Sequence, residues 1–210
     1  MIILPLTYFG PVQYYSKFFF GESPVIEQYD NYNKQSFRNR CVILGANGPI
    51  PLVIPVKKNR TEKTLVKDIL IDYDTNWRKL HWRGIVSSYS SSPYFEYYRD
   101  SIEPFYTKSY NFLSDYCFEI TLLILKLINI ESYPALTTGY VFAGDVRIDY
   151  DFRDVIHPKK DVNVDRTYIP QTYRQVFSER FGFFQNLSII DLLFNLGPES
   201  PGLLKRSLLV

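Results

Sequence analysis

Cysteine and histidine are scarce in this chain of 210 residues, and their scarcity excludes several kinds of site. The cysteines are Cys41 and Cys117, and the histidines are His81 and His157. No two cysteines have the C-x-x-C spacing, and no cysteine and histidine stand close enough together for a structural zinc site. Two isolated thiols are typical of a reducing compartment, so we expect free thiols and no disulfide framework.

A large excess of charge of either sign is also missing. The 24 lysine and arginine residues nearly balance the 22 aspartate and glutamate residues, which gives a net charge of +2. Such a balance provides no general attraction for DNA, RNA or an anionic membrane, so we expect no nucleic-acid partner. Local clusters of basic residues are then the places where a phosphate could bind.

Long uncharged hydrophobic runs are absent as well. The most apolar stretch, residues 112–130, is too polar for a membrane span because it contains Asp115, Glu119, Lys126 and Asn129. The amino-terminal residues have neither the basic start nor the small-residue cleavage site of a signal peptide. We therefore expect a soluble protein with no membrane insertion and a cytoplasmic location.

No strong catalytic motif is present. The sequence contains no G-x-x-x-x-G-K-[ST], G-x-G-x-x-G, H-E-x-x-H or G-x-S-x-G pattern. The carboxylates of Asp151, Asp154 and Asp191 permit a metal site, but their spacing does not require one. We therefore predict no metal and no cofactor.

Aromatic side chains, by contrast, are abundant. The chain contains 18 tyrosines and 16 phenylalanines, and 46% of its residues are hydrophobic, which is enough for a large core. Because tyrosine combines an apolar ring with a polar hydroxyl, these side chains suit either the outer part of a core or the wall of a polar pocket. The length fits one domain that spans residues 1–210.

Strand-like segments are concentrated in the first half of the chain. Apolar runs bounded by turn residues predict strands at 2–9, 25–29, 37–44, 50–56 and 65–71. Asn47 and Gly48 lie between two of these runs and predict a hairpin. Pro49, Pro51 and Pro55 indicate that the second strand of this hairpin is either an edge strand or irregular.

Helices predominate in the middle and last parts of the chain. Trp77, His81, Ile85 and Ser88 fall on one helical stripe, and the apolar repeat through 111–129 predicts the longest helix. The sequence also predicts a polar surface loop at 145–164, a short strand and turn at 135–142, and further helices at 13–20, 94–106 and 187–196. The predicted fold class is α/β: a single mixed α/β domain with a strand-rich N-terminal half and a helix-rich remainder.

His81 lies in the sequence Trp77-Arg78-Lys79-Leu80-His81-Trp82-Arg83. Two interpretations are open: a packed histidine bonded to a backbone carbonyl, or a catalytic general base at a pocket wall. If Arg78 and Arg83 lie close to the imidazole, their charges lower its pKa and keep it able to accept a proton.

His157 lies in a segment dense in charged residues, between Asp154 and Lys160. We predict a loop here, and long loops in compact domains are usually either functional or disordered. The imidazole is therefore either a solvated loop side chain or a second catalytic residue, on a loop that closes over a charged ligand.

Arg38, Asn39 and Arg40 form a third cluster. On the predicted strand at 37–44, Arg38 and Arg40 point to one face and Asn39 points to the other. Two guanidinium groups on one face can hold a phosphate or a carboxylate through paired hydrogen bonds. The alternative is an ordinary sheet surface with salt bridges. We take all three as candidate substrate-binding residues.

Several segments carry, in a fixed order, a resemblance to a known family. They are Tyr8-Phe9-Gly10-Pro11-Val12-Gln13-Tyr14-Tyr15-Ser16-Lys17, Phe37-Arg38-Asn39-Arg40, Asn47-Gly48-Pro49, Ile54-Pro55-Val56, the stretch from Trp77 to Trp82, Tyr173-Arg174-Gln175-Val176-Phe177 and Leu187-Ser188-Ile189-Ile190-Asp191-Leu192-Leu193-Phe194-Asn195. Together they make the chain similar to the WbqC-like family, in the form common in Bacteroidetes, from about residue 5 to residue 200. The family's opening motif usually has Gln-Pro followed by Pro-Trp-x-Gly, whereas the opening segment here lacks that tryptophan.

The resemblance implies a place in the biosynthesis of O-antigen and other surface polysaccharides, and hence a transferase acting on an activated or amino sugar. It brings no set of catalytic residues, so we assign roles from chemistry. Arg38 and Arg40 would hold the diphosphate of a nucleotide-linked sugar, and His81 would take a proton from the group that attacks the acyl or aminoacyl donor. Gln13 and Tyr14, just past the first predicted strand, would contact the sugar.

A second hypothesis needs no catalytic motif. The protein could be a noncatalytic binding or scaffold protein of an envelope-assembly pathway. The two hypotheses differ in whether Arg38, Arg40 and His81 converge on one pocket, and the sequence leaves the oligomeric state open.

Overall fold

The computed structural model describes residues 1–57 and 63–209, and it contains a parallel sheet of short strands. β1 (Ile2–Pro5), β2 (Val25–Glu27), β5 (Ala135–Leu136) and β6 (Tyr150–Asp151) lie in the order β5-β2-β1-β6. Ile3 pairs with Val25 on one side and with Asp151 on the other, and Val25 pairs with Ala135. Because all these strands are parallel, their carboxyl ends meet at one edge of the sheet.

The chain passes from one side of β1 to the other between β5 and β6. β2 and β5 lie on one side of β1, whereas β6 lies on the other. In open parallel sheets such a change of direction leaves a crevice at the carboxyl edge, between the loops that follow the two adjacent strands, and ligands commonly bind there. In this protein those loops begin at Leu6 and Phe152. They are the first places to look for a site.

A separate hairpin is formed by β3 (Arg40–Gly45) and β4 (Gly48–Val53). Its strands are antiparallel, and Gly48 has φ +110°, a conformation that glycine adopts without strain. Pro49 and Pro51 lie on β4, which pairs only with β3 in the described part of the chain. The hairpin and its proline-bearing edge strand are therefore confirmed.

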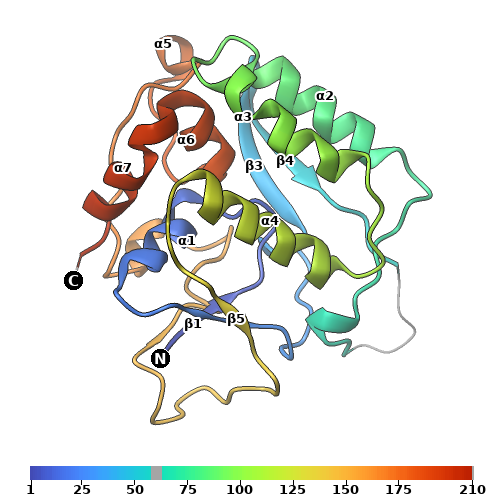
Figure 1. The fold of residues 1–210 in the computed structure, drawn as a ribbon, viewed down its shortest axis with the longest axis vertical. Helices are drawn as coiled ribbons and strands as arrows, with labels where there is room; N and C mark the ends of the chain where they lie inside the picture. The colour runs from blue at the N-terminus through green and yellow to red at the C-terminus, as the bar shows by residue number, and fades with distance from the viewer. Residues whose placement is uncertain (58–62, 210) are drawn as a thin grey trace.

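Helices pack around the sheet and the hairpin (Figure 1). α2 (Trp77–Tyr89) contacts β3, while α3 (Phe95–Ile102) contacts α6 (Ile189–Leu196). α1 (Val12–Ser16) contacts both α6 and α7 (Ser200–Arg206). The other elements are α4 (Leu113–Leu127), α5 (Ser178–Phe181) and the 3-10 turns η1 (Lys17–Phe19), η2 (Val66–Asp68), η3 (Glu103–Tyr106), η4 (Val162–Val164) and η5 (Gly197–Glu199). The fold is a mixed α/β fold, as predicted.

Helix predictions agree best where the apolar periodicity is clear. α4 buries Leu113, Cys117, Ile120 and Ile124 of its predicted seam and leaves Leu127 half-buried, and α2 buries all four residues of its predicted stripe. Such a stripe forms because one face of the helix must be covered by the core. No helix within residues 1–57 and 63–209 is long and apolar enough to span a membrane.

Several predicted segments differ from the structure, and the strand predicted at 2–9, for example, ends at Pro5. Residues 65–71 form the turn η2 with isolated bridges on either side; their buried side chains Val66, Ile69 and Ile71 do not alternate as a strand requires. The strand predicted from residue 37 begins only at Arg40. The predicted loop at 145–164 contains β6 and η4. A two-residue strand in a polar segment owes its conformation to its partner β1, not to its own sequence.

Tyrosine is prominent in the core. Tyr8, Tyr14, Tyr15, Tyr89 and Tyr116 are all less than 2% exposed. Some of their hydroxyls find partners inside the protein: Tyr8 bonds Tyr106 at 2.8 Å, and Tyr89 donates to Asp191 at 2.9 Å. Of the two uses that the sequence left open for the aromatic residues, these tyrosines serve the core.

Candidate functional site

A cleft of about 280 Å³ lies between the β3–β4 hairpin and two loops. One wall is the segment 157–162, which follows β6, and a second wall is the segment 184–187, which precedes α6. The lining residues are Phe37, Val42, Pro49, His157, Pro158, Lys160, Asp161, Val162, Phe184, Gln185, Asn186 and Leu187. The lining exposes polar and apolar surface in similar measure, so the cleft can both pack against a small molecule and hydrogen-bond it.

Backbone hydrogen bonds tie this cleft to the loop that follows β1. The N–H of Tyr8 donates to the carbonyl of Phe37 at 2.9 Å, and the N–H of Val12 donates to the carbonyl of Leu187 at 3.0 Å. Phe37 and Leu187 both line the cleft. The cleft therefore lies next to the loop after β1 and is lined in part by the loop after β6, which are the two loops where the sheet topology favours a ligand site.

His157 is the imidazole of the cleft. Its Nδ1 accepts a hydrogen bond from the backbone N–H of Lys159 at 3.2 Å, so in the neutral ring Nε2 carries the proton and acts as a donor. Partial burial lowers the pKa of His157, as do the charges of Lys160, Arg38 and Lys159, while Asp154 opposes them. A neutral imidazole with Nε2–H suits donation to a ligand oxygen better than removal of a proton.

Arg38 lies beside the cleft but is buried. Its side chain is 3% exposed and its Nη2 donates to Oδ2 of Asp30 at 2.5 Å. Burial lowers the pKa of Arg38, whereas the charges of Asp30 and Asp154 raise it. Because Arg38 lies in the turn before β3, the prediction that it shares a strand face with Arg40 is wrong. Arg38 and His157 nonetheless lie close enough for the arginine to lower the histidine's pKa.

Arg40 and Asn39 have different surroundings at the start of β3. The amide of Asn39 is buried and donates to the carbonyl of Ile54 at 2.8 Å, so it holds the backbone next to the hairpin. Arg40 is half-buried and lies two residues before Val42, which lines the cleft. Alternate residues of a strand share a face and lie about 7 Å apart. Arg40 is therefore the arginine of the cluster on the cleft side of β3.

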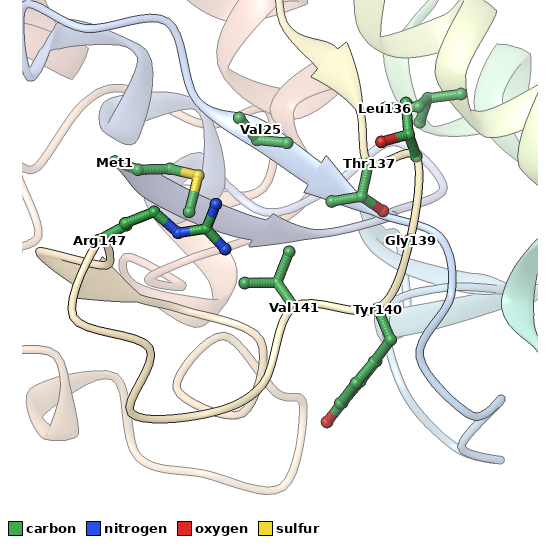
Figure 2. Close-up of a pocket in the computed structure, with 9 residues that line it drawn as sticks. Met1, Val25, Leu136, Thr137, Gly139, Tyr140, Val141 and Arg147 are labelled. Atoms are coloured by element: carbon green, nitrogen blue, oxygen red, sulfur yellow. The ribbon is translucent and has the colours of Figure 1, made fainter.

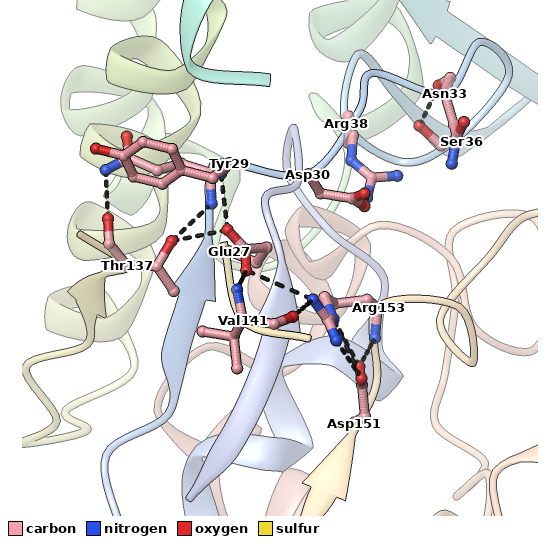
Figure 3. A network of polar contacts seen from close by, with 11 residues as sticks. Glu27, Tyr29, Asp30, Asn33, Ser36, Arg38, Thr137, Val141, Asp151 and Arg153 are labelled. Atoms are coloured by element: carbon pink, nitrogen blue, oxygen red, sulfur yellow. Dashed lines mark hydrogen bonds and ion pairs between the residues drawn. The ribbon is translucent and has the colours of Figure 1, made fainter. Parts of the chain in front are cut away.

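A buried ion-pair network occupies the carboxyl edge of the sheet itself (Figure 3). Glu27, the last residue of β2, is fully buried and accepts hydrogen bonds from the hydroxyl of Thr137 at 2.8 Å and the N–H of Val141 at 3.0 Å. Arg153 lies 3.5 Å from the same carboxylate and also pairs with Asp151 at 2.5 Å. The loops after β2, β5 and β6 are thus joined by their own side chains.

Sequence reasoning did not select Glu27 or Arg153. Their position is the signal that could have found them, because each ends or closely follows a strand whose carboxyl end meets the others at one edge. For Glu27 the preceding strand was predicted. For Arg153 it was not, since β6 lies within the segment predicted as a loop.

Gln13 and Tyr14 do not line the cleft. Gln13 is 2% exposed; its side chain donates to Asp165 at 2.8 Å and accepts from the amide of Asn186 at 3.1 Å. Because Asn186 lines the cleft, Gln13 lies directly behind that wall. Tyr14 is fully buried and packs edge-on against Tyr15. Contact of Gln13 and Tyr14 with a sugar stays a prediction.

His81 is part of the core, 6% exposed, and does not line the cleft. Its Nδ1 lies 3.1 Å from the hydroxyl of Tyr8. Burial lowers the pKa of His81 to about 4, and a hydrogen bond with the backbone of Val53 opposes that shift. The predicted cause of the low pKa, the charges of Arg78 and Arg83, is therefore wrong. A catalytic role for His81 stays a prediction.

A second pocket, of about 360 Å³, lies over the first residues of β1 and β2 (Figure 2). Met1 and Val25 form part of its lining, together with Arg147 and the segment 136–141. The guanidinium of Arg147 donates to Asp145 at 2.9 and 2.6 Å, which balances its charge locally. None of the predicted site residues lines this pocket. The cleft that contains His157 is therefore the stronger candidate site.

The part of the chain that the structure describes contains no set of metal ligands. No group of three or more His, Cys, Asp and Glu side chains there could hold a metal ion. Asp151 is paired with Arg153, and Asp191 lies in the core among hydroxyl and amide donors. The polar groups of the cleft are therefore the imidazole of His157, the ammonium of Lys160, the carboxylate of Asp161 and two side-chain amides.

These features define a mixed α/β protein with a cleft between the β3–β4 hairpin, the loop after β6 and the segment before α6. The model of the WbqC-like protein family matches residues 7–147, so the chain belongs to that family, as its sequence segments predicted. The chain is similar to the uncharacterized protein Rv1507c of Mycobacterium tuberculosis, with 26% identity over 225 residues that cover 91% of each chain. No solved structure matches the chain.

Proposed function

We propose that the cleft binds a nucleotide-linked sugar and that the protein transfers an acyl or aminoacyl group to that sugar, in the cytoplasmic synthesis of surface polysaccharide. The observation that carries the proposal is the cleft, which combines apolar surface with the imidazole of His157 and the ammonium of Lys160 on the loop that follows β6. Membership of the WbqC-like family supports the polysaccharide pathway, because that is the expectation the resemblance brings.

The polar part of the lining suits a phosphate. Lys160 offers a charge and His157 offers Nε2–H, while Asp161 adds a carboxylate to the same wall. Arg40 does not line the cleft, but it shares a face of β3 with Val42, which does. Hydrogen bonds from charged donors to phosphate oxygens are stronger than those between neutral groups. Because the guanidinium of Arg38 is buried against Asp30, Arg38 acts on the ligand through its electrostatic field and not through direct contact.

The apolar part of the lining suits a ring. Phe37, Phe184 and Pro49 provide flat surface on which a sugar or a base can pack. A volume of about 280 Å³ holds only part of a nucleotide-linked sugar. In the proposal the sugar and the nearer phosphate lie in the cleft, and the nucleoside lies along the outer face of the hairpin.

Acyl transfer needs a base other than His157, because the Nδ1 lone pair of that imidazole is taken by Lys159. In the proposal an amine or hydroxyl of the sugar attacks the acyl carbon, the exposed carboxylate of Asp161 takes its proton, and the carrier of the donor leaves with the electron pair of the broken acyl bond. The proposal therefore gives His157 the role of donor, to the phosphate or to the oxyanion that forms during transfer. His81, the base chosen from the sequence, touches Tyr8 instead of the cleft and receives no ligand contact in this proposal.

A binding experiment tests the proposal. Wild-type protein is titrated with UDP-linked and dTDP-linked sugars and with the free diphosphates, by calorimetry and by thermal shift. We expect a melting-temperature rise and, for His157→Gln and Lys160→Ala, about tenfold weaker binding for each hydrogen bond removed. Lys205→Ala, on the exposed side of α7, is the matched control. Equal affinities in all variants, or no binding to wild type, would refute the site.

The buried state of the reactive side chains favours a second function. His81 is 6% exposed, and both thiols, Cys41 and Cys117, are buried. With these groups out of reach, the same cleft could serve a noncatalytic binding protein of an envelope-assembly pathway. The two functions separate when the bound sugar is incubated with acyl and aminoacyl donors: a modified sugar identifies the transferase, whereas ligand recovered unchanged supports the binding protein.

A further inference from the structure

The two walls of the cleft come from separate parts of the chain. One wall is the segment 157–162, and the other is the segment 184–187. Behind them lies a chain of four buried or half-buried polar side chains, which we call the latch: Lys17, Asp165, Gln13 and Asn186. The proposed function gives Lys17 and Asp165 neither a catalytic nor a ligand-binding role.

The ion pair of the latch is completely enclosed. Lys17 Nζ lies 2.6 Å from Oδ2 of Asp165, and the two side chains are 0% and 1% exposed. The ammonium also donates to the hydroxyl of Thr167 at 2.9 Å, and it lies 4.7 Å from the ring centre of Phe152 and 5.4 Å from that of Tyr168. The ion pair thus fixes the segment that follows the first wall against the end of α1.

Asp165 is held by more than the lysine. Its Oδ2 also accepts from the side-chain amide of Gln13 at 2.8 Å, and its Oδ1 accepts from both the N–H and the hydroxyl of Thr167, at 3.0 and 2.7 Å. Both carboxylate oxygens of Asp165 therefore have partners, and these hydrogen bonds fix the orientation of its side chain. It lies three residues beyond Val162, the last lining residue of the first wall.

Gln13 carries the connection to the second wall. Its side-chain oxygen accepts from Nδ2 of Asn186 at 3.1 Å, and its backbone N–H donates to Oδ1 of Asn186 at 3.0 Å. The reciprocal pair holds Asn186 at φ +57°, a left-handed conformation that asparagine tolerates better than most residues. The second wall therefore turns at a residue that α1 orients.

A buried ion pair is a poor means of simple stabilisation, because removing two charges from water offsets most of their attraction, and an apolar pair of similar size often serves as well. Directional bonds do what apolar contacts cannot: they fix distance and angle. We propose that the latch sets the spacing of the two cleft walls, so that Lys17, Asp165 and Gln13 are positioning residues for the ligand. The ligand part of this inference rests on the proposed function.

Two variants remove different links. The double variant K17M/D165L replaces the ion pair with apolar side chains and leaves no lone charge. Gln13→Leu removes the side-chain bonds of Gln13 to Asp165 and Asn186 but keeps the ion pair and the backbone bond from Gln13 to Asn186. Ile124→Ala, a core truncation on α4 away from the cleft, controls for general loss of stability. Hydrogen exchange of the ligand-free proteins is followed for the amides of 157–165 and 184–187.

We expect exchange to accelerate at least about tenfold in both walls of K17M/D165L, and in 184–187 but not in 157–165 of Gln13→Leu. In Ile124→Ala any acceleration should be no greater in the walls than elsewhere. Walls that exchange at the wild-type rate in Gln13→Leu would overturn the latch, even if the double variant fails to fold.

Affinity for a UDP-linked sugar gives the second measurement. If wild type binds it, the two latch variants should bind at least about tenfold more weakly while Ile124→Ala binds as wild type does. Unchanged affinity would overturn the positioning role. If wild type does not bind, the proposed function fails, and the exchange data still decide whether the latch holds the walls.

Discussion

The carboxylate of Asp191 is buried away from solvent, so it tests how burial changes the pKa of a group in the core. The side chain is 0% exposed and lies on α6. It accepts hydrogen bonds from Tyr89 at 2.9 Å, Tyr173 at 2.7 Å and Gln175 at 3.1 Å. Burial raises the pKa of Asp191 from 3.8 to about 6, although all three of these hydrogen bonds act to lower it.

The direction of the resulting pH dependence follows from proton binding. Between about pH 4 and pH 6 the folded protein holds a proton on Asp191 that the unfolded chain has released, so the free energy of unfolding falls as the pH rises. The full contribution is present below pH 3.8 and is lost as the pH passes about 6. The two pKa values correspond to about 3 kcal/mol, as an upper value for this one group.

Asp191→Asn isolates this contribution, because asparagine keeps the shape and cannot titrate. Urea unfolding of wild type and variant is measured at intervals from about pH 4 to about pH 7 at constant ionic strength. We expect the stability of the variant relative to wild type to rise by up to about 3 kcal/mol across this range, whatever constant offset the amide introduces. A difference that stays constant within about 0.5 kcal/mol would refute the reasoning.

Two further predictions concern buried groups. Burial raises the pKa of both thiols, so a thiol reagent should label Cys41 and Cys117 only when urea unfolds the protein; rapid labelling of the native protein would contradict their burial. Gly197 has φ +52°, and an added Cβ would lie 2.6 Å from the ring of Tyr94, so Gly197→Ala should lower stability by about 2–5 kcal/mol. Gly144→Ala, with φ +84° and open space around it, should lower stability by only about 1–2 kcal/mol, and equal losses would remove the argument from the ring contact.

The sequence predicted those parts of the fold that depend on local pattern. α4 and α2 follow from apolar residues repeated on one face, and the hairpin follows from Asn-Gly between two apolar runs. β6 was not predictable, because Tyr150 and Asp151 adopt strand geometry through pairing with β1. A short strand of this kind depends on a partner that is distant in the sequence. The full strand order of the parallel sheet could therefore not be predicted.

For the candidate site, the types of residue were easier to predict than the directions in which their side chains point. Arg38 and His157 were both chosen from their local sequence, and the fold brings them into electrostatic contact. Gln13 was chosen because it follows the first strand; it lies behind one wall of the cleft, since α1 turns its side chain toward Asp165, and its contact with a ligand stays a prediction. His81 was placed on the correct helical stripe, and that stripe faces Tyr8 in the core.

The position of the cleft follows from the buried ion pair of Glu27 and Arg153, which the sequence did not reveal. In parallel α/β sheets the carboxyl edge is open to ligands because backbone groups and loop ends point into a crevice there. Here Glu27 and Arg153 meet across that edge at 3.5 Å, and Thr137 completes the coordination of the carboxylate. A ligand at the strand ends would have to break a buried ion pair and leave an unpaired charge, which is strongly unfavourable. The accessible volume therefore lies farther along the loop after β6, where His157 and Lys160 face the hairpin.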